Sequence, residues 1–324
     1  MSRTIALMFV LAVLVAAGVL APGSSGAARH KYKMVLTVEP QDPRLPGARE
    51  AAKRLGVRTV LSHPYDVHQL IAGHDDAIAS DGYDPSLRPF FRKARKAGVL
   101  VLSSGDHIAG KNDLWVNYSG ATDFGHALAD ALASQIQDKG EYAILEEQHQ
   151  YPIGTTWEKI VAAYIPQAYP NMKLDGVLNL TGAGDQAELD AVESFMSAHP
   201  GLRGLIGIAP TEAYMAAAAI TQTGEIGQIF AAGNGGSSLK GTDMVGYVKS
   251  GSTVDVMPGD PVKLGYLTVW AAHRLLTGHH FRAGEYRLGE WGLRVTYHPK
   301  HQELRLGQPL TITSANLDQY VGQP

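Results

Sequence analysis

The chain has 324 residues, a formal net charge of −3 and no cysteine. It carries no dense run of lysine and arginine, which argues against nucleic acid as a partner because phosphate binding needs clustered cations. Without cysteine it forms neither a disulfide nor a thiol-linked lipid anchor, so its stability must come from a large buried core. The length suggests one large domain or two of ordinary size.

The N-terminal segment has the pattern of a secretory signal. Arg3 supplies a positive charge, the segment 5–21 is apolar, and the segment 22–28 is rich in small residues. This order predicts a signal peptide over residues 1–28 that is cleaved near its end. The alternative is a membrane anchor, but the apolar run lies at the lower edge of the ~17–25 residues that a span needs. We therefore expect a soluble protein in the periplasm or outside the cell.

Short apolar runs alternate with amphipathic stretches along the rest of the chain. In the first half we expect strands at 33–38, 57–61, 76–80 and 99–103, and helices at 46–55 and 85–97. In the second half we expect helices at 121–137, 155–168, 185–198 and 211–224, and strands at 142–145, 176–180, 202–208 and 228–232. Near-continuous apolar strands that alternate with helices indicate parallel sheets covered on both faces.

The end of the chain departs from this alternation. A long helix is expected at 261–277, followed by β-like segments at 286–297 and 308–312. Two successive sets of strands and helices predict two similar α/β lobes. The late helix is separated from the first set by the whole second set, so it suits a chain that returns to the first lobe.

Three collinear segments carry a family resemblance. They are Met244–Arg274 (MVGYVKSGSTVDVMPGDPVKLGYLTVWAAHR), Ala198–Ala219 (AHPGLRGLIGIAPTEAYMAAAA) and the closing stretch Phe281–Tyr320 with its NLDQY. Together they resemble type I periplasmic sugar-binding proteins, and within them the rhamnose-binding and autoinducer-2-binding branch. The first segment resembles the last ligand loop of that branch and the helix that returns to the N-terminal lobe.

The resemblance implies an α/β fold of the periplasmic-binding-protein type I class. Two Rossmann-like lobes with parallel sheets would be joined by three hinge crossings, near Asn117, Asp260 and Trp291. The N-terminal lobe would then comprise 29–117 plus 261–291, and the C-terminal lobe 118–260 plus 292–324. The implied function is that of a monomeric binding protein, not an enzyme, which needs no cofactor or metal. It would pass a small sugar-like ligand to the membrane permease of an ABC transporter.

Candidate ligand-binding residues of the first lobe follow predicted strands. Glu39 directly follows the first strand, where it is either a ligand contact or part of a solvated turn. Asp106 and His107 follow the strand at 99–103, and the family has aspartates nearby that accept hydrogen bonds from sugar hydroxyls. The alternative for Asp106 is an Asx turn.

The second lobe offers five further candidates by resemblance. Trp157 opens a helix and either lines the ligand site or packs. Pro210 and Glu212 follow a strand, although Glu212 could simply be an acidic residue in the first turn of a helix. Asn234 stands in a glycine-rich loop, and Asp260 matches a family aspartate just before the returning helix.

Several positions depart from the pattern of the branch. Gly259 replaces an aromatic residue, so one stacking surface for a sugar ring is lost, and Ile153 replaces an aspartate. The stretch between Leu61 and Asp76 is shorter than in the family. The resemblance is therefore stronger for the family than for the solute.

Two other functions and a metal site are alternatives to this interpretation. A signalling or chemosensory sugar receptor would share the same fold and ligand site. An exported hydrolase would use Asp106, His107 and Glu212, but the chain contains no recognised motif that pairs a nucleophile with a base. A zinc site is disfavoured because the histidines, such as His63, His68 and His74, follow no metal-binding motif.

Overall fold

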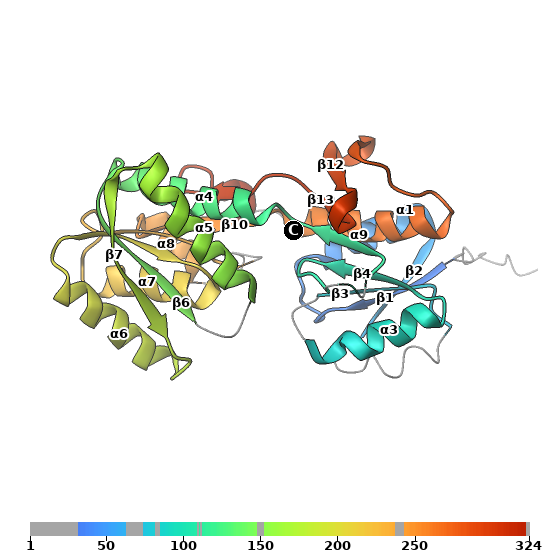
Figure 1. Ribbon diagram of the computed structural model, residues 1–324, viewed down its shortest axis with the longest axis horizontal. Helices are drawn as coiled ribbons and strands as arrows, with labels where there is room; N and C mark the ends of the chain where they lie inside the picture. Colours follow the sequence, from blue (N-terminus) through green and yellow to red (C-terminus); the bar gives the residue numbers. More distant parts are fainter. Residues whose placement is uncertain are drawn as a thin grey trace, which may run out of the picture.

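The protein forms two lobes that lie side by side (Figure 1) in the computed structural model. The structure describes residues 32–62, 74–81, 85–108, 110, 112–147, 152–236 and 243–321. The predicted signal peptide and the shortened stretch after Leu61 lie almost wholly outside these residues. Within them, no helix is both long and apolar enough to cross a membrane.

The first lobe is built on an eight-stranded sheet with the order β11-β12-β13-β5-β4-β3-β1-β2. Strands β1 to β5 pair in parallel, and β13 continues this parallel arrangement, whereas β12 pairs antiparallel with both of its neighbours. The strands are β1 (Tyr32–Thr37), β2 (Val57–Leu61), β3 (Ala77–Ser80), β4 (Leu100–Ser104), β5 (Leu114–Asn117), β11 (Gly284–Leu288), β12 (Leu293–His298) and β13 (Glu303–Arg305).

Helices cover both faces of this sheet. Helices α1 (Leu45–Leu55) and α9 (Pro261–Leu276) pack on one face, and α3 (Arg88–Lys96) packs on the other through Phe90 and Phe91. Because β1, β3 and β4 are almost fully buried between these layers, they read as continuous apolar runs in the sequence.

The second lobe has a six-stranded sheet with the order β14-β10-β9-β8-β6-β7, in which only β14 is antiparallel. Helices α4 and α5 cover one face, and α6, α7 and α8 cover the other. The elements are α4 (Ala121–Ile136), β6 (Lys139–Glu147), α5 (Pro152–Ala168), β7 (Asn171–Leu180), α6 (Asp185–Ala198), β8 (Leu202–Gly207), α7 (Pro210–Gln222), β9 (Phe230–Gly233), α8 (Met244–Ser250), β10 (Thr253–Met257), β14 (Leu310–Ile312) and α10 (Asp318–Val321).

The chain passes between the lobes three times. The first crossing, 118–120, follows β5, and the second, 258–260, precedes α9. The third was expected near Trp291, and that position is wrong. Because β12 and β13 pair within the first sheet, the third crossing lies at 306–309, and residues 292–305 belong to the first lobe.

Other differences concern short elements. The segment 247–254 (YVKSGSTV), interpreted as part of a ligand loop, forms the end of α8 and the start of the buried strand β10. The expected β-segment 286–297 is a hairpin of two strands, with β11 beginning at Gly284. Strand β5 was not expected at all. Its pairing depends on β4 and β13, which are distant in sequence, and four residues carry little periodicity of their own.

Candidate functional site

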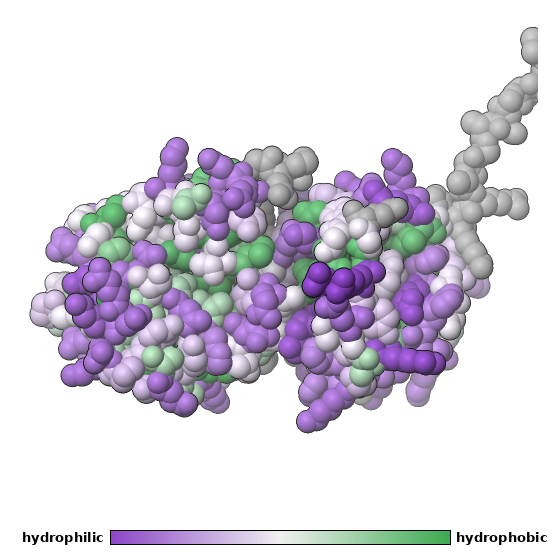
Figure 2. Space-filling model, turned by 90° about the horizontal axis from the view of Figure 1, so that it is seen from above, coloured by the Kyte–Doolittle hydropathy of each residue, from purple (hydrophilic) through white to green (hydrophobic). Residues whose placement is uncertain are grey.

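The parallel strands of both sheets end on the sides of the lobes that face each other (Figure 1). The space-filling view shows the surface hollowed between the two lobes (Figure 2). Described side chains that follow β1, β3 and β4 therefore form one wall of this furrow, and those that follow β8 and β9 form the other. In open α/β sheets, ligands bind outside the carboxyl ends of the strands.

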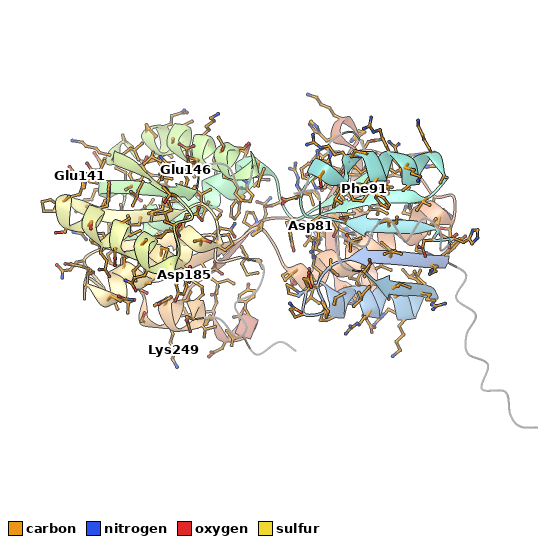
Figure 3. All side chains as sticks on the ribbon, turned by 90° about the horizontal axis from the view of Figure 1, so that it is seen from below. Asp81, Phe91, Glu141, Glu146, Asp185 and Lys249 are labelled. Atoms are coloured by element: carbon orange, nitrogen blue, oxygen red, sulfur yellow. The ribbon has the colours of Figure 1, made fainter. Side chains whose placement is uncertain are left out.

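A guanidinium lies at the centre of the first wall. Arg44 binds Asp42 through two hydrogen bonds, of 2.9 Å from Nε and 2.6 Å from Nη2. Its Nη2 also lies 2.5 Å from a carboxylate oxygen of Asp81, and its Nη1 donates to the carbonyl oxygen of Ser104 at 2.7 Å. Asp81 lies on the edge of its lobe beside the crossings (Figure 3). The positive charge of this wall is thus already paired with two carboxylates. We call Arg44, Asp42, Asp81 and Ser104 the Arg44 cluster.

Burial alone would lower the pKa of Arg44. The charge of Asp81 and the hydrogen bond to Asp42 raise that pKa well above its usual value, so the guanidinium stays cationic. Buried ion pairs of this kind are stable only when further hydrogen bonds support them, and with Ser104 each of the three guanidinium nitrogens has a partner. The residues are therefore held in one fixed arrangement.

Asp106 lies next to the Arg44 cluster. Its backbone amide donates to Asp81 at 3.3 Å, and the left-handed turn at Gly105 (φ 97°) brings the chain against Asp81. Burial and the charge of Asp81 raise the pKa of Asp106 to about 6, although Arg44 acts in the opposite direction. At neutral pH this side chain is a carboxylate beside a second one, so it can accept hydrogen bonds from hydroxyl groups.

Behind the cluster lies a cavity of about 20 Å³. Arg44, Asp81, Ser104 and Thr268 provide its polar groups, and the hydroxyl groups of Ser104 and Thr268 lie 2.9 Å apart. This volume admits about one water molecule and excludes a sugar ring. A larger ligand must therefore lie on the furrow side of the cluster.

Three other predicted residues of the site make different contacts. Glu39 is exposed in a turn closed by the hydrogen bond from the Asp42 amide to its carbonyl. His107 stacks on Trp115 with ring centroids 4.6 Å apart, and burial lowers its pKa. Trp157 packs against Phe124 at 4.5 Å in the core of the second lobe, as the alternative for this residue proposed.

The second wall brings together three predicted residues. Pro210 and Glu212 begin α7 directly after β8, and Glu212 is almost completely buried there. The amide of Asn234 donates to Gly207 at 3.0 Å, and its side-chain oxygen accepts from Gly236 at 3.3 Å. These contacts hold the loop after β9 against the end of β8.

Asp260 has a clear local role as the N-cap of α9. Its Oδ1 accepts from the amide of Lys263 at 3.2 Å, and its Oδ2 lies 3.2 Å from the ammonium of the same residue. Such caps satisfy the open amides at the start of a helix. A contact between Asp260 and a solute stays a prediction.

Asp255 is a buried acid beneath the loop after β9 that sequence reasoning missed. Its Oδ1 accepts from the amide of Gly235 at 2.6 Å, and Oδ2 has no hydrogen-bond partner among the described residues. Burial raises the pKa of Asp255 to about 7, although the Gly235 amide lowers it. The side chain therefore changes charge near neutral pH without a compensating cation.

Replacing Asp255 with asparagine should weaken the dependence of stability on pH. The folded protein holds the proton up to pH about 7, whereas a free side chain releases it near 3.8. The wild type therefore loses stability as the pH rises through this window. Asparagine keeps the acceptor for Gly235 without the charge. The stability of D255N relative to wild type should thus grow with pH, by up to about 4 kcal/mol.

Urea unfolding at a series of pH values, followed by circular dichroism, measures this difference. The matched control is Asp190→Asn on α6, because Asp190 is exposed. Its stability should follow the wild type at every pH. If the D255N curve also runs parallel to the wild type, Asp255 does not titrate in this window.

Sequence reasoning also missed Arg44, Asp81 and Tyr118. Asp81 directly follows β3, so the same rule that selected Asp106 would have selected it. Arg44 precedes α1 and matches no sequence pattern of a binding site, because its role depends on the approach of β3 and β4 in space.

Within the described residues, no group of three or more histidine, aspartate or glutamate side chains is arranged to hold a metal ion.

Two α/β lobes, three crossings and two facing walls of strand ends define the class of bilobed binding proteins. Residues 45–280 match the model of the periplasmic binding protein domain, and the chain belongs to that family. Among the curated proteins, none matches this chain.

Solved structures share the fold over nearly their whole length. A sugar ABC transporter protein from Actinomyces odontolyticus has a TM-score of 0.75 and 21% identity, over 89% of this chain and 96% of that chain. An ABC transporter solute-binding protein from Clostridium phytofermentas with bound L-rhamnose has a TM-score of 0.68 and 21% identity, over 89% and 97%. LsrB from Clostridium saccharobutylicum in complex with AI-2 has a TM-score of 0.71 and 15% identity, over 89% and 99%. The predicted type I fold is confirmed.

Proposed function

We propose that this protein is the extracytoplasmic solute-binding protein of an ABC importer. It captures a neutral monosaccharide or sugar-like solute between its lobes by hinge closure and presents the closed form to a membrane permease. Residues 1–28 are then a cleaved signal peptide, and the working form is a monomer. The family and the sugar-binding proteins of the same fold support this assignment.

The Arg44 cluster is the observation that favours a neutral solute. Its guanidinium is engaged by Asp42, Asp81 and the Ser104 carbonyl, so this wall offers carboxylate acceptors and no unengaged arginine among its described residues. Sugar hydroxyls donate to carboxylates in charge-assisted hydrogen bonds. The negative charge of an anionic solute would instead be repelled by these carboxylates, and between the lobes few water molecules would screen that repulsion.

The positions of the residues proposed for a hydrolase do not support catalysis. Asp106 and Glu212 lie on opposite walls, and His107 is stacked on Trp115. A base must lie within hydrogen-bond reach of the group that it activates. We therefore propose binding without covalent chemistry.

A thermal-shift panel tests the proposed class of solute. We expect at least one of L-rhamnose, D-arabinose, D-allose and AI-2 to raise the melting temperature, with about 2.7 kcal/mol of stabilisation at a hundredfold excess over its dissociation constant. Asp106→Asn removes the charged acceptor, so it should reduce that shift. D-glucuronate, L-leucine and adenosine are the controls, and none should stabilise the protein. A shift from one of these controls alone would sink the assignment to neutral sugars.

A further inference from the structure

Tyr118 lies where the three crossings meet. It belongs to the first crossing, and its carbonyl oxygen accepts a hydrogen bond of 2.9 Å from the amide of Gly307 in the third crossing. Its ring lies against Gly259 of the second crossing, because a Cβ added at Gly259 would lie 3.0 Å from Cδ1 of Tyr118. Through its backbone carbonyl and its ring, this one residue thus contacts both of the other connections between the lobes.

Tyr118 directly follows β5, and β5 pairs in parallel with β4, so Tyr118 lies beside the residues of the first wall that follow β4. The amide of Gly105 in that wall donates to the carbonyl oxygen of Val116 at 2.9 Å. Burial raises the pKa of Tyr118, and the charges of Asp81, Asp42 and Asp260 raise it further while Arg44 lowers it. These four charged groups belong to the Arg44 cluster and to the second crossing. The residue packs against the core of the first lobe and is only partly buried.

The contact between Tyr118 and Gly259 explains the missing aromatic residue at position 259. A larger side chain at 259 would overlap the Tyr118 ring, since a single methyl group there would already be in tight contact with its Cδ1 and Cβ atoms. Glycine at 259 therefore leaves room for the ring of Tyr118. The ring of Tyr118 on the first crossing occupies the space beside Gly259 on the second crossing.

We infer that Tyr118 supplies the aromatic surface of the solute site in place of residue 259 and thereby helps to determine which solute binds. This inference rests on the proposed function. An aromatic face packs against the apolar side of a sugar ring, while carboxylates accept from its hydroxyl groups. Tyr118 and the Arg44 cluster provide both kinds of group at adjacent positions.

Calorimetric titration of the protein with whichever panel sugar binds tests the role of the ring. Tyr118→Phe keeps the aromatic face, so we expect its affinity to stay within about threefold of the wild type. Tyr118→Leu keeps apolar bulk but loses the face, and we expect about tenfold weaker binding, which corresponds to about 1.4 kcal/mol. Tyr164→Leu on α5 is the matched control, because Tyr164 stacks on His126 within the second lobe. Wild-type affinity in a folded Y118L protein would overturn the inference.

A stability cycle tests the pairing without any solute. Gly259→Val should lower the melting temperature clearly in the wild type and much less in a Tyr118→Ala background, because the overlapping ring is then gone. Equal losses in the two backgrounds would contradict the pairing. If no panel sugar binds the wild type, the proposed function fails and the solute role of Tyr118 fails with it, while the cycle still decides whether the two residues are coupled.

Discussion

Alanine in place of Gly265 is expected to destabilise the first lobe by about 2–3 kcal/mol. A Cβ at Gly265 would lie 1.9 Å from the carbonyl oxygen of Arg44 and 3.1 Å from the amide nitrogen of Ala48. All of the atoms that it would strike belong to the backbone of α1 or its N-cap, so no side chain can move aside. Helices α1 and α9 would have to separate, and the Arg44 cluster would shift with them.

A second variant, at a glycine of the facing helix α1, and a control variant in α8 make this test specific. A Cβ at Gly47 of α1 would lie 1.8 Å from the carbonyl oxygen of Val262, so G47A should have a similar effect. Gly246 in α8 has nothing within 4 Å of its added Cβ. G246A should therefore stabilise the protein by about 0.5–1 kcal/mol, because alanine favours helix. Urea denaturation measures all three variants, and a neutral G265A would contradict the close helix contact.

Arg44→Ala is expected to cost about 3 kcal/mol of stability and to abolish solute binding. The substitution leaves the carboxylates of Asp42 and Asp81 without their cation, and these side chains are only 12% and 25% exposed. It also removes the donor to the Ser104 carbonyl. Unfolding by urea measures the first effect, and calorimetry with the panel sugar measures the second.

Two further variants separate charge from a general loss of packing. Adding Asp81→Asn to R44A removes one stranded carboxylate, so part of the lost stability should return. Arg54→Ala removes an exposed arginine that pairs with Glu50 on the surface of α1, and it should leave the unfolding midpoint nearly unchanged. If R44A and R54A behave alike, the Arg44 cluster does not stabilise the fold.

The long elements of the fold could be predicted because their patterns are local. The helix expected at 261–277 corresponds to α9, and the apolar run at 99–103 corresponds to β4. Strand β13 and the third crossing could not be predicted in this way. Three residues of β13 carry no usable periodicity, and their place in the sheet depends on pairing with β5, which is far away in the sequence.

The candidate site could be predicted only in part for a related reason. Asp106 could be proposed because it follows a strong strand, and Asn234 because it stands in a glycine-rich loop at a position that matches the family. A contact between either residue and a solute stays a prediction. Arg44 and Tyr118 could not be predicted from the sequence because their roles depend on residues that approach them in space. Gly259 was recognised as a departure, but the ring that fills the space beside it lies 141 positions earlier in the chain (259 minus 118).

Small-angle X-ray scattering with and without the bound sugar tests capture between the lobes most directly. Hinge closure brings the lobes together, so the radius of gyration should fall when the sugar saturates the site. D-glucuronate at the same concentration should leave it unchanged. Calorimetric binding of the sugar with no change in the radius of gyration would contradict the account, because the solute would then bind outside the furrow or without closing it.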